Sequence, residues 1–469
     1  MNKNEIREGT VIAIGMNGEG VLKDEGKVVF VPFTLTGEKI KYKVLKTAAN
    51  CVYGKAEEIV TPAEERVRPK CAVFGKCGGC QLQHVRYATQ LKIKEENIAT
   101  CFRKIAFTDV KVVPAVRGDD EFGYRNKLQL PVSVDKSGGT IIGFYAENSH
   151  RVVPVSECPI NAVWTSDIIS AFKEYFETFG IKGYNEETQI GDIREIAVKD
   201  VKGKLIITVV TTTDILPFKD KLLEILQNKV RYTFALYLNV NKAHNNVIFS
   251  ERFIHLYGNK DFSADMLGIK YKVGVQSFMQ VNDCVAAKLY SMVNTLADVD
   301  ENTVVIDAYS GAGLMTALLS KRAKKAIGIE IVPEAVHLAN ELALQNGLSE
   351  KITNYQGKCE EIMPDIIEKE KASGNKIVVV LDPPRKGCDL KVIDAVKNSN
   401  ADKIIYVSCK PSTLARDVGL ITGTLHHDGA KIEKAVSSDG KYIINSVRPF
   451  DMFAQTKHIE TICELVRKK

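Results

Sequence analysis

The chain has 469 residues, of which 45% are hydrophobic and 26% charged, so it has the composition of a folded globular protein with roughly two to four domains. It contains no run of the roughly 18 apolar residues that a membrane helix needs, and MNKNEIREGT lacks the apolar core of a signal peptide. We therefore expect a cytoplasmic protein without a membrane span, and the net charge of +6 is too small to identify its partner.

Residues 6–60 alternate between short β-prone segments and turns that contain glycine. GTVIAI, GEGVLKDEGKVVFVP, EKIKYKVLKTA and NCVYGKAEEIV are typical of strands, and the Asp24-Glu25-Gly26 sequence is typical of a hairpin turn. Five short strands in about 55 residues predict an OB-like barrel, a scaffold that often binds single-stranded nucleic acid. We expect this domain to span residues 1–63.

Positive charge and cysteine gather directly after this region. Residues 66–104 contain nine Lys or Arg and two Glu, which leaves a local charge of +7. Such a stretch is either a solvated helix face or a surface that binds phosphates.

CAVFGKCGGCQLQH within this stretch places Cys71, Cys77 and Cys80 in C-x5-C-x2-C spacing, and Cys158 in VSECPI can add a fourth thiolate. Four thiolates hold either tetrahedral zinc or an iron–sulfur cluster. The glycine pair before the third cysteine leaves room for a bulky group, so the spacing favours the cluster over zinc and over no metal.

The region up to residue 265 is expected to be an α+β domain. It contains an amphipathic helical pattern near 87–104, and the segments 124–134 and 139–155 read as one hairpin. A second hairpin is expected over 193–211. We assign residues 64–265 to this central domain.

From about residue 300, strands alternate with helical patterns, which predicts a parallel, doubly wound α/β sheet. Two further strands, near 430–438 and 442–448, are expected to form an antiparallel edge. We assign residues 266–469 to this third domain, whose parallel strands are predicted at 303–308, 325–330, 352–356, 377–381 and 403–408.

The first of these strands leads into a glycine turn and a helix in NTVVIDAYSGAGLMTALLS. Gly311 and Gly313 allow the turn to approach a ligand closely, and Glu330 ends the next strand, where an acidic group can accept hydrogen bonds from a ribose. Thr316 replaces the third glycine of a pyrophosphate-binding fingerprint, and Asp307 before the turn suits a cationic ligand. The pattern favours S-adenosylmethionine over NAD.

Two more strand ends point into the same crevice, because ligands of open α/β sheets bind beyond the carboxyl ends of the strands. Asp382 follows the fourth strand and Cys409 follows the fifth. Lys410 and the start of a helix at Pro411 are expected to favour the thiolate form of Cys409 over a structural thiol.

A thiolate beside a methyl donor suggests chemistry on a pyrimidine. Addition of the thiolate to C6 makes C5 a nucleophile and divides one difficult step into two. A base must later remove the C5 proton, and the C-terminal segment offers His458 and Glu460.

Several motifs together resemble the RNA uracil-C5 methyltransferase family, and the resemblance covers essentially the whole chain. They occur in the family's order and spacing, and GVQSFMQVN matches a further family motif. Ala454 stands where the family usually has proline, and Leu314 where some members have a polar cofactor contact. The motifs are DAYSGAGLMTALLS, GIEIVPEAV, LDPPRKG, YVSCKPSTLARD and FDMFAQTKHIE.

The resemblance implies that Cys409 is the nucleophile and Glu460 the base. Lys358 stands where an acidic or amide residue is common in the family, and we include it among the expected cofactor contacts. The complete predicted cofactor-binding set is Gln280, Asp307, Tyr309, Gly311, Gly313, Glu330, Lys358 and Asp382.

The resemblance also implies a class I, Rossmann-like methyltransferase domain, an N-terminal TRAM barrel that binds RNA, and a 4Fe–4S cluster on the four cysteines. Barrel and cluster predict 23S ribosomal RNA as the substrate, with transfer RNA as the alternative. The target uracil must leave any stack to reach Cys409. We interpret the cluster as shaping an RNA-binding surface, and the candidate RNA contacts are Phe30, Phe33, Arg125, Lys127, Phe144 and Tyr145.

Two other classes of protein share some of these features. One is an iron–sulfur RNA-binding protein with an inert methyltransferase domain, which the intact DPPRKG, SCKP and HIE motifs disfavour. The other is a radical enzyme, which usually needs three cysteines in one compact loop and an open iron. No obligate protein partner is implied.

Overall fold

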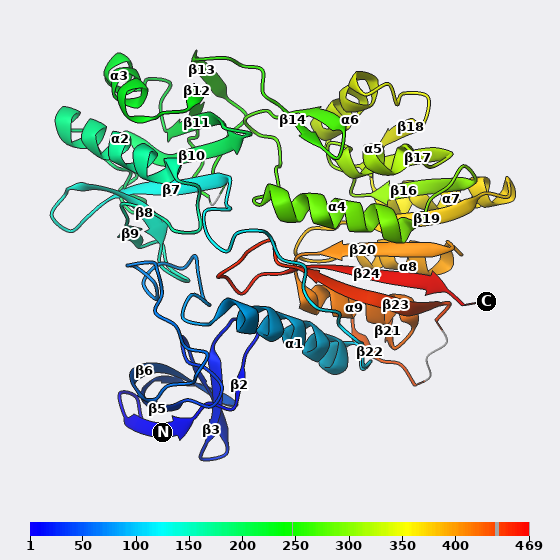
Figure 1. The fold of residues 1–469 in the computed structure, drawn as a ribbon, viewed down its shortest axis with the longest axis horizontal. Coiled ribbons are helices and arrows are strands. Elements are labelled where there is room, and N and C mark those ends of the chain that lie inside the picture. Colours follow the sequence, from blue (N-terminus) through cyan, green and yellow to red (C-terminus); the bar gives the residue numbers. More distant parts are fainter. Residues whose placement is uncertain (246, 437–439, 469) are drawn as a thin grey trace.

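The computed structural model describes residues 1–245, 247–436 and 440–468, and its strands form three large sheets (Figure 1). The N-terminal sheet has six strands in the order β1-β5-β6-β4-β3-β2. Its core contains Leu22, Val29, Ile40 and Tyr42. The strands are β1 (Ile6–Thr10), β2 (Ala13–Ile14), β3 (Gly20–Asp24), β4 (Lys27–Val31), β5 (Lys39–Thr47) and β6 (Cys51–Thr61).

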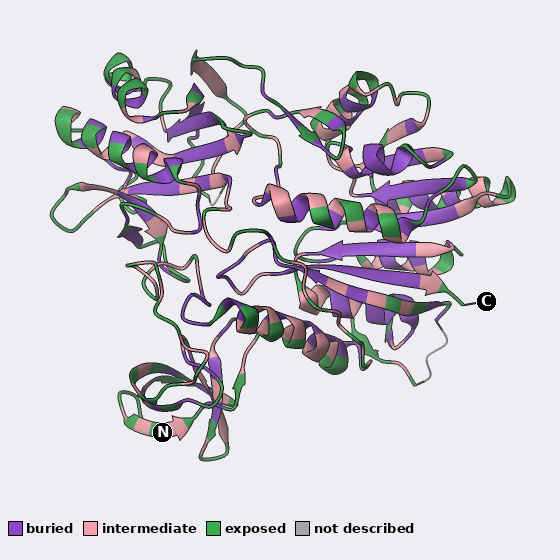
Figure 2. Ribbon diagram, in the orientation of Figure 1, coloured by how far each residue is buried: buried purple, intermediate pink, exposed green. Residues whose placement is uncertain are grey.

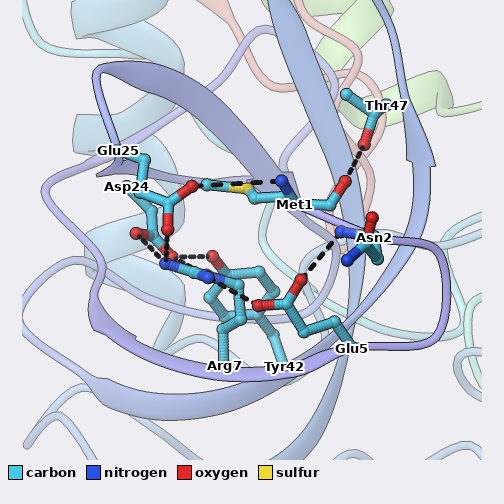
Figure 3. Close-up of polar contacts among 8 residues, drawn as sticks. All are labelled: Met1, Asn2, Glu5, Arg7, Asp24, Glu25, Tyr42 and Thr47. Atoms are coloured by element: carbon cyan, nitrogen blue, oxygen red, sulfur yellow. Dashed lines mark hydrogen bonds and ion pairs between the residues drawn. The ribbon is translucent and has the colours of Figure 1, made fainter.

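A polar network closes the outer side of this sheet (Figure 3). The Arg7 guanidinium binds Asp24 through its Nη2 atom at 2.7 Å and Glu5 through its Nη1 atom at 2.6 Å. The hydroxyl of the buried Tyr42 also donates to Asp24. These contacts link β1, β3 and β5.

The central sheet has seven strands in the order β13-β12-β11-β10-β7-β8-β9. The two expected hairpins are present as the antiparallel pairs β7–β8 and β10–β11. The elements are β7 (Lys127–Val134), β8 (Thr140–Tyr145), β9 (Val152–Pro154), β10 (Ile193–Val201), β11 (Lys204–Thr211), β12 (Thr233–Val240), β13 (Phe253–Tyr257), α2 (Trp164–Phe179) and α3 (Lys219–Lys229).

Helices α2 and α3 were not expected from the sequence. The apolar side chains of α2 recur at helical spacing, as Trp164, Ile168, Phe172 and Tyr175 show, and they are buried against the sheet together with α3. The strong β-prone segments on both sides obscure this period in the sequence.

The C-terminal sheet has the order β18-β17-β16-β19-β20-β24-β23. Its five parallel strands lie where the sequence predicts them, and four of them, β16, β17, β19 and β20, are largely buried, whereas the edge strand β18 is partly exposed (Figure 2). β24 enters the sheet antiparallel to both neighbours. The strands are β16 (Thr303–Ala308), β17 (Lys325–Glu330), β18 (Ile352–Gln356), β19 (Lys376–Leu381), β20 (Lys403–Ser408), β23 (Tyr442–Phe450) and β24 (Glu460–Arg467).

Helices cover both faces of this sheet, as in a doubly wound fold. α4, α5, α6 and the hairpin β14–β15 cover one face. α7, α8, α9 and α1 cover the other face. These elements are α4 (Asp283–Ala297), α5 (Leu314–Ser320), α6 (Pro333–Gln345), β14 (Ser263–Met266), β15 (Ile269–Lys272), α7 (Cys359–Ala372), α8 (Leu390–Asn398), α9 (Pro411–Thr422) and α1 (Tyr87–Ile105).

Helix α1 matches the helix expected near 87–104, but it lies beside α9 in the C-terminal layer (Figure 1). Ile98, Cys101 and Phe102 of α1 belong to the same buried cluster as Leu414 and Val418 of α9. The chain therefore crosses from the N-terminal sheet to the C-terminal layer before it forms the central sheet.

The antiparallel edge differs from the expectation in two ways. The strand expected near 430–438 is only β22 (Ile432–Lys434), which pairs with β21 (Leu425–His427) outside the main sheet, and 437–438 lie outside the described residues. The strand beginning at Glu460 was not expected. Among the described residues, no helix is long and apolar enough to cross a membrane.

Candidate active site

One cavity of about 610 Å³ lies at the carboxyl ends of the parallel strands. It is lined by residues that follow β16, β19 and β20, by the start of β24 and by the segment that precedes α4. The sequence-predicted residues that line it are Gln280, Asp307, Tyr309, Gly311, Asp382, Cys409 and Glu460.

Strand register explains why Cys409 and Glu460 meet. β20 pairs with β24 so that Ser408 lies opposite Thr461. In an antiparallel pair the next residue of one strand faces the preceding residue of the other, so Cys409 comes opposite Glu460. Backbone pairing therefore brings together two residues that are separated by fifty residues in the sequence.

The turn after β16 adopts left-handed backbone conformations at the cavity. Tyr309 has φ of 66° and Gly311 has φ of 53°, and such values at a residue other than glycine are costly and typical of functional sites. The Gly311 amide donates to Glu330 Oε2 at 3.0 Å, and the Val332 amide donates to Glu330 Oε1 at 2.9 Å. Glu330 therefore fixes the turn from the end of β17.

Three predicted cofactor residues do not line the cavity. Glu330 lies behind the turn, and Gly313 is needed for packing because a Cβ atom there would lie 2.8 Å from Ala339 Cβ on α6. The exposed Lys358 pairs its Nζ with Glu361 Oε1 at 3.0 Å.

Three acidic side chains in the cavity have raised pKa values. Burial raises the pKa of Asp307 to about 7 and the pKa of Asp382 to about 6. Burial, reinforced by Asp382 and opposed by Arg385, raises the pKa of Glu460 to about 8. The side chain of Asp382 is exposed and lines the cavity. A cationic ligand would relieve this concentration of acidic groups.

Cys409 is half-buried, and the direction of its pKa shift differs from the expectation. Burial raises the pKa of Cys409, Glu460 and Asp382 add to the rise, and Arg385 opposes it by charge and hydrogen bonding. The exposed Lys410, expected to favour the thiolate, is not among these causes. In the free protein, burial and the neighbouring acids therefore hold the pKa of Cys409 above its ordinary value.

Sequence reasoning missed Arg385 and Phe278 as lining residues. Arg385 directly follows the rigid Asp-Pro-Pro turn at the carboxyl end of a strand. Residues at such ends line the ligand site of an open α/β sheet, so its position in the sequence indicates a place in the cavity. Phe278 lies in the GVQSFMQVN motif and is 79% exposed.

His458, the other candidate base, contacts the Phe453 ring, and burial lowers its pKa to about 4. It is therefore neutral near pH 7.

The central sheet holds the segment that carries Gln280. Asn126 donates through Nδ2 to the Gln280 carbonyl at 3.0 Å, and its amide donates to the Val281 carbonyl at 3.0 Å. The ammonium of Lys199 on β10 donates to the carbonyls of Val275 and Ser277, each at 2.6 Å. One wall of the cavity is thus fixed by residues outside the C-terminal sheet.

Cys71, Cys77, Cys80 and Cys158 line a second cavity of about 160 Å³. Within the described ranges, no group of three or more His, Cys, Asp or Glu residues is arranged to hold a metal ion. Burial raises the pKa of Cys80 to about 12 and that of Cys158 to about 11. The four cysteines thus share one cavity, and burial keeps the thiols of Cys80 and Cys158 neutral.

The profile of the tRNA (Uracil-5-)-methyltransferase family matches residues 86–468. The chain belongs to this family. It is 35% identical to an uncharacterized RNA methyltransferase of Clostridium acetobutylicum over 100% of this chain and 98% of the relative. It is 36% identical to an uncharacterized RNA methyltransferase of Listeria monocytogenes over 99% of this chain and 98% of the relative.

Among solved structures, the fold is similar to that of the Pyrococcus abyssi tRNA (uracil-54, C5)-methyltransferase in complex with S-adenosyl-L-homocysteine. The TM-score is 0.74 at 24% sequence identity, with 98% of this chain and 100% of that chain covered. Family membership confirms the resemblance identified from the motifs. The protein is an RNA uracil-C5 methyltransferase, a class of enzyme that takes its methyl group from S-adenosylmethionine.

The raised pKa of Glu460 predicts a pH-dependent effect of Glu460→Gln on stability. The cost of ionising the buried carboxyl is absent below its unfolded value of 4.5, grows as the pH rises, and is complete above about 8. The variant should therefore melt at a higher temperature than wild type at pH 9 and at nearly the same temperature at pH 4.

Glu464→Gln is the matched control, because Glu464 is a buried glutamate on the same strand that pairs with Lys403 at 3.3 Å. Its replacement removes an ion pair and should lower the melting temperature at pH 9. A Glu460→Gln variant that melts below wild type at pH 9 would contradict the assignment of a costly carboxylate.

Proposed function

We propose that the protein forms 5-methyluridine in RNA, with Cys409 as the nucleophile and Glu460 as the base. The observation that carries this proposal is the meeting of these two side chains across the β20–β24 pair in the wall of one cavity. Half-burial gives Cys409 access to a ligand, whereas Glu460 is buried and only 7% exposed. The acidic groups around the cavity match a cationic cofactor.

Cys409 Sγ forms a bond to C6 of the uracil, and the displaced electron pair makes C5 a nucleophile. Bound S-adenosylmethionine supplies the methyl group as an electrophilic carbon on a sulfonium. Once C5 is methylated, the Glu460 carboxylate takes the C5 proton, and the C5–H electron pair forms the C5=C6 double bond. The C6–S bond breaks as this double bond forms, and its electrons return to the sulfur of Cys409.

Arg385 supports the thiolate, since it is the group that lowers the pKa of Cys409 against burial and the acids. For the cofactor we propose Asp307, Tyr309, Gly311 and Asp382 at the cavity, with Gln280 facing the base and cofactor. Glu330 and Gly313 would act by shaping the turn. Lys358, paired with Glu361, is assigned no role.

The two catalytic assignments predict opposite covalent behaviour. Cys409→Ala should abolish methylation and form no protein–RNA adduct. Glu460→Gln should accumulate an adduct that survives denaturation, because Sγ–C6 bond formation needs no base at C5 whereas release does. Denaturing electrophoresis with labelled RNA measures both outcomes.

Cys284→Ala is the control for the first variant, because Cys284 is partly exposed on α4 and does not line the cavity. Glu464→Gln is the control for the second. Turnover by Cys409→Ala would remove Cys409 as the nucleophile. Wild-type protein that binds RNA without methylating it would instead identify an inert RNA-binding protein.

We propose 23S ribosomal RNA as the substrate. The N-terminal sheet, which we assign to a TRAM-type OB-like barrel over residues 1–63, and the cysteine cavity support this choice. Transfer RNA is the second candidate, since the Pyrococcus abyssi tRNA enzyme matches essentially the whole chain. We divide the remainder into a central domain over 64–265 and a catalytic domain over 266–469.

Mapping of 5-methyluridine separates the two substrates. Deletion of the gene should remove one or more 5-methyluridines from 23S ribosomal RNA and leave transfer RNA unchanged. The wild-type gene, but not the Cys409→Ala gene, should restore the modification. Loss confined to transfer RNA would establish the alternative.

We propose that the four cysteines hold a 4Fe–4S cluster. A cluster places each thiolate on a different iron, so it needs a wider cage than one zinc ion with Zn–S bonds of about 2.3 Å. The shared cavity of about 160 Å³ supports the wider cage. A positive metal centre would also deprotonate thiols that burial keeps neutral.

Anaerobic purification should yield a brown protein that contains iron and sulfide. Cys158→Ala should lose the visible absorption, whereas Cys51→Ala, which changes a partly exposed cysteine of the N-terminal sheet, should keep it. Colourless wild-type protein with stoichiometric zinc would overturn the cluster. Metal analysis and absorption spectra provide the measurement without an activity assay.

A further inference from the structure

Residues 451–459 form the loop that connects β23 to β24, and the two ends of this loop lie side by side in the sheet. Phe450, which ends β23, pairs with Glu460, which begins β24. Figure 1 shows this connection as a red loop that reaches beyond the sheet toward α1 and the central region. Strand pairing fixes the two ends of this loop but not its tip. The tip is therefore ordered only if other elements bind it.

Helix α1 supplies the main contact through a buried charge. Lys94 is 1% exposed, and its Nζ donates to Asp451 Oδ1 at 2.6 Å and to the Phe453 carbonyl at 3.1 Å. Asp451 is fully buried and also accepts a hydrogen bond from the Tyr87 hydroxyl at 2.8 Å. One ammonium from the N-terminal half of the chain thus binds a side chain and a carbonyl of the loop.

Further hydrogen bonds hold the tip of the loop. The side chain of Gln90 on α1 donates to Gln455 Oε1 at 2.9 Å and accepts from the Gln455 amide at 3.1 Å. The Leu82 amide, two residues beyond Cys80, donates to the Gln455 carbonyl at 3.0 Å. The Tyr124 hydroxyl donates to the Ala454 carbonyl at 2.9 Å.

The held loop forms part of the wall of the catalytic cavity. Phe453 lines that cavity with Cys409 and Glu460, and Lys94 binds the carbonyl of the same Phe453. The ring of Phe453 contacts His458 at a centroid distance of 5.9 Å. Movement of the loop would open the wall beside Glu460 to water.

We propose that Lys94 is a positioning residue for the release step, in which it holds the loop against the cavity through Asp451 and Phe453 and keeps water away from Glu460. This inference rests on the proposed roles of Cys409 and Glu460. Lys94 itself touches no reacting atom. Addition of Cys409 to C6 depends on β20 and the turn after β19, so that step does not need the loop contact.

The environment of Glu460 gives this role a signature in the pH profile. Asp382 and Arg385 face Glu460 from the segment after β19, Cys409 faces it from the end of β20, and Tyr290 faces it from α4. These groups remain when the loop moves, whereas the burial that raises the pKa of Glu460 to about 8 is lost. Proton removal by wild type should rise as the pH rises through about 8, and the rise should move to lower pH when the wall opens.

Lys94→Met/Asp451→Asn is the informative variant. Lys94→Met alone leaves Asp451 as an unpaired buried charge, which is strongly destabilising, whereas the double variant removes both charges. Lys403→Met/Glu464→Gln is the control, because Lys403 also pairs with a buried carboxylate, Glu464, at the start of β20, and neither residue lines the cavity. The probe is total RNA from a deletion strain, labelled with tritium at uridine C5.

The double variant should retain the first methyl transfer and slow tritium release about tenfold or more, as expected for a misplaced catalytic group. A methylated protein–RNA adduct should accumulate, and the pH profile of tritium release should shift to lower pH. The control variant, Lys403→Met/Glu464→Gln, should give the same ratio of adduct to product as wild type.

The positioning role of Lys94 would be overturned if the folded double variant gave the wild-type ratio of adduct to product and an unshifted pH profile of tritium release. So would a double variant that does not fold, since Lys94 would then be a structural residue. If wild type forms no adduct even with RNA containing 5-fluorouridine, which has no C5 proton to remove, the proposed function fails and takes this inference with it.

Discussion

The insertion of β24 antiparallel between β20 and β23 is the constraint on which the site depends. Parallel strands bring only their carboxyl ends to the cofactor edge of the sheet, so residues that begin a strand would normally lie at the opposite edge. The reversed direction of β24 brings its first residue, Glu460, to the edge where β20 delivers Cys409. The positions of the proposed nucleophile and base are therefore set by one backbone register, and a shift by one residue would turn Glu460 to the other face of the sheet.

This arrangement carries an electrostatic cost that the chemistry uses. Asp307 and Glu460 are buried, Asp382 lines the same cavity, and the pKa of each of the three is raised. A carboxyl with a pKa near the working pH can accept and return a proton readily, whereas an ordinary glutamate would be a much weaker base. Burial raises the pKa of Cys409, and Glu460 and Asp382 add to the rise, so a nearby positive charge favours its thiolate. Arg385 supplies part of that charge, and a cationic cofactor would supply more.

The sequence predicts the parallel strands and the residues at their ends because buried strands bounded by turns have a clear pattern. It does not predict β24, whose apolar run is as compatible with a buried helix as with a strand. Gly313 shows a different limit: the glycine is required, but by the close approach of Ala339 on α6 rather than by a ligand. Nor could the sequence give the direction of the Cys409 pKa shift, because the shift depends first on burial and then on Glu460, Asp382 and Arg385, which only the fold brings near.

The catalytic cavity and the cysteine cavity have a wall in common, since Arg125 lines both. Its Nε donates to the Lys127 carbonyl at 2.9 Å, and its backbone pairs with the segment that follows Cys158. Asn126, the next residue, holds the carbonyl of Gln280, and the loop after Cys80 holds Gln455. Two walls of the catalytic cavity are therefore fixed by segments adjacent to the cysteines. The cavity walls can therefore be ordered only when the cysteine region is folded. This dependence requires no electron transfer between the cysteines and the cavity.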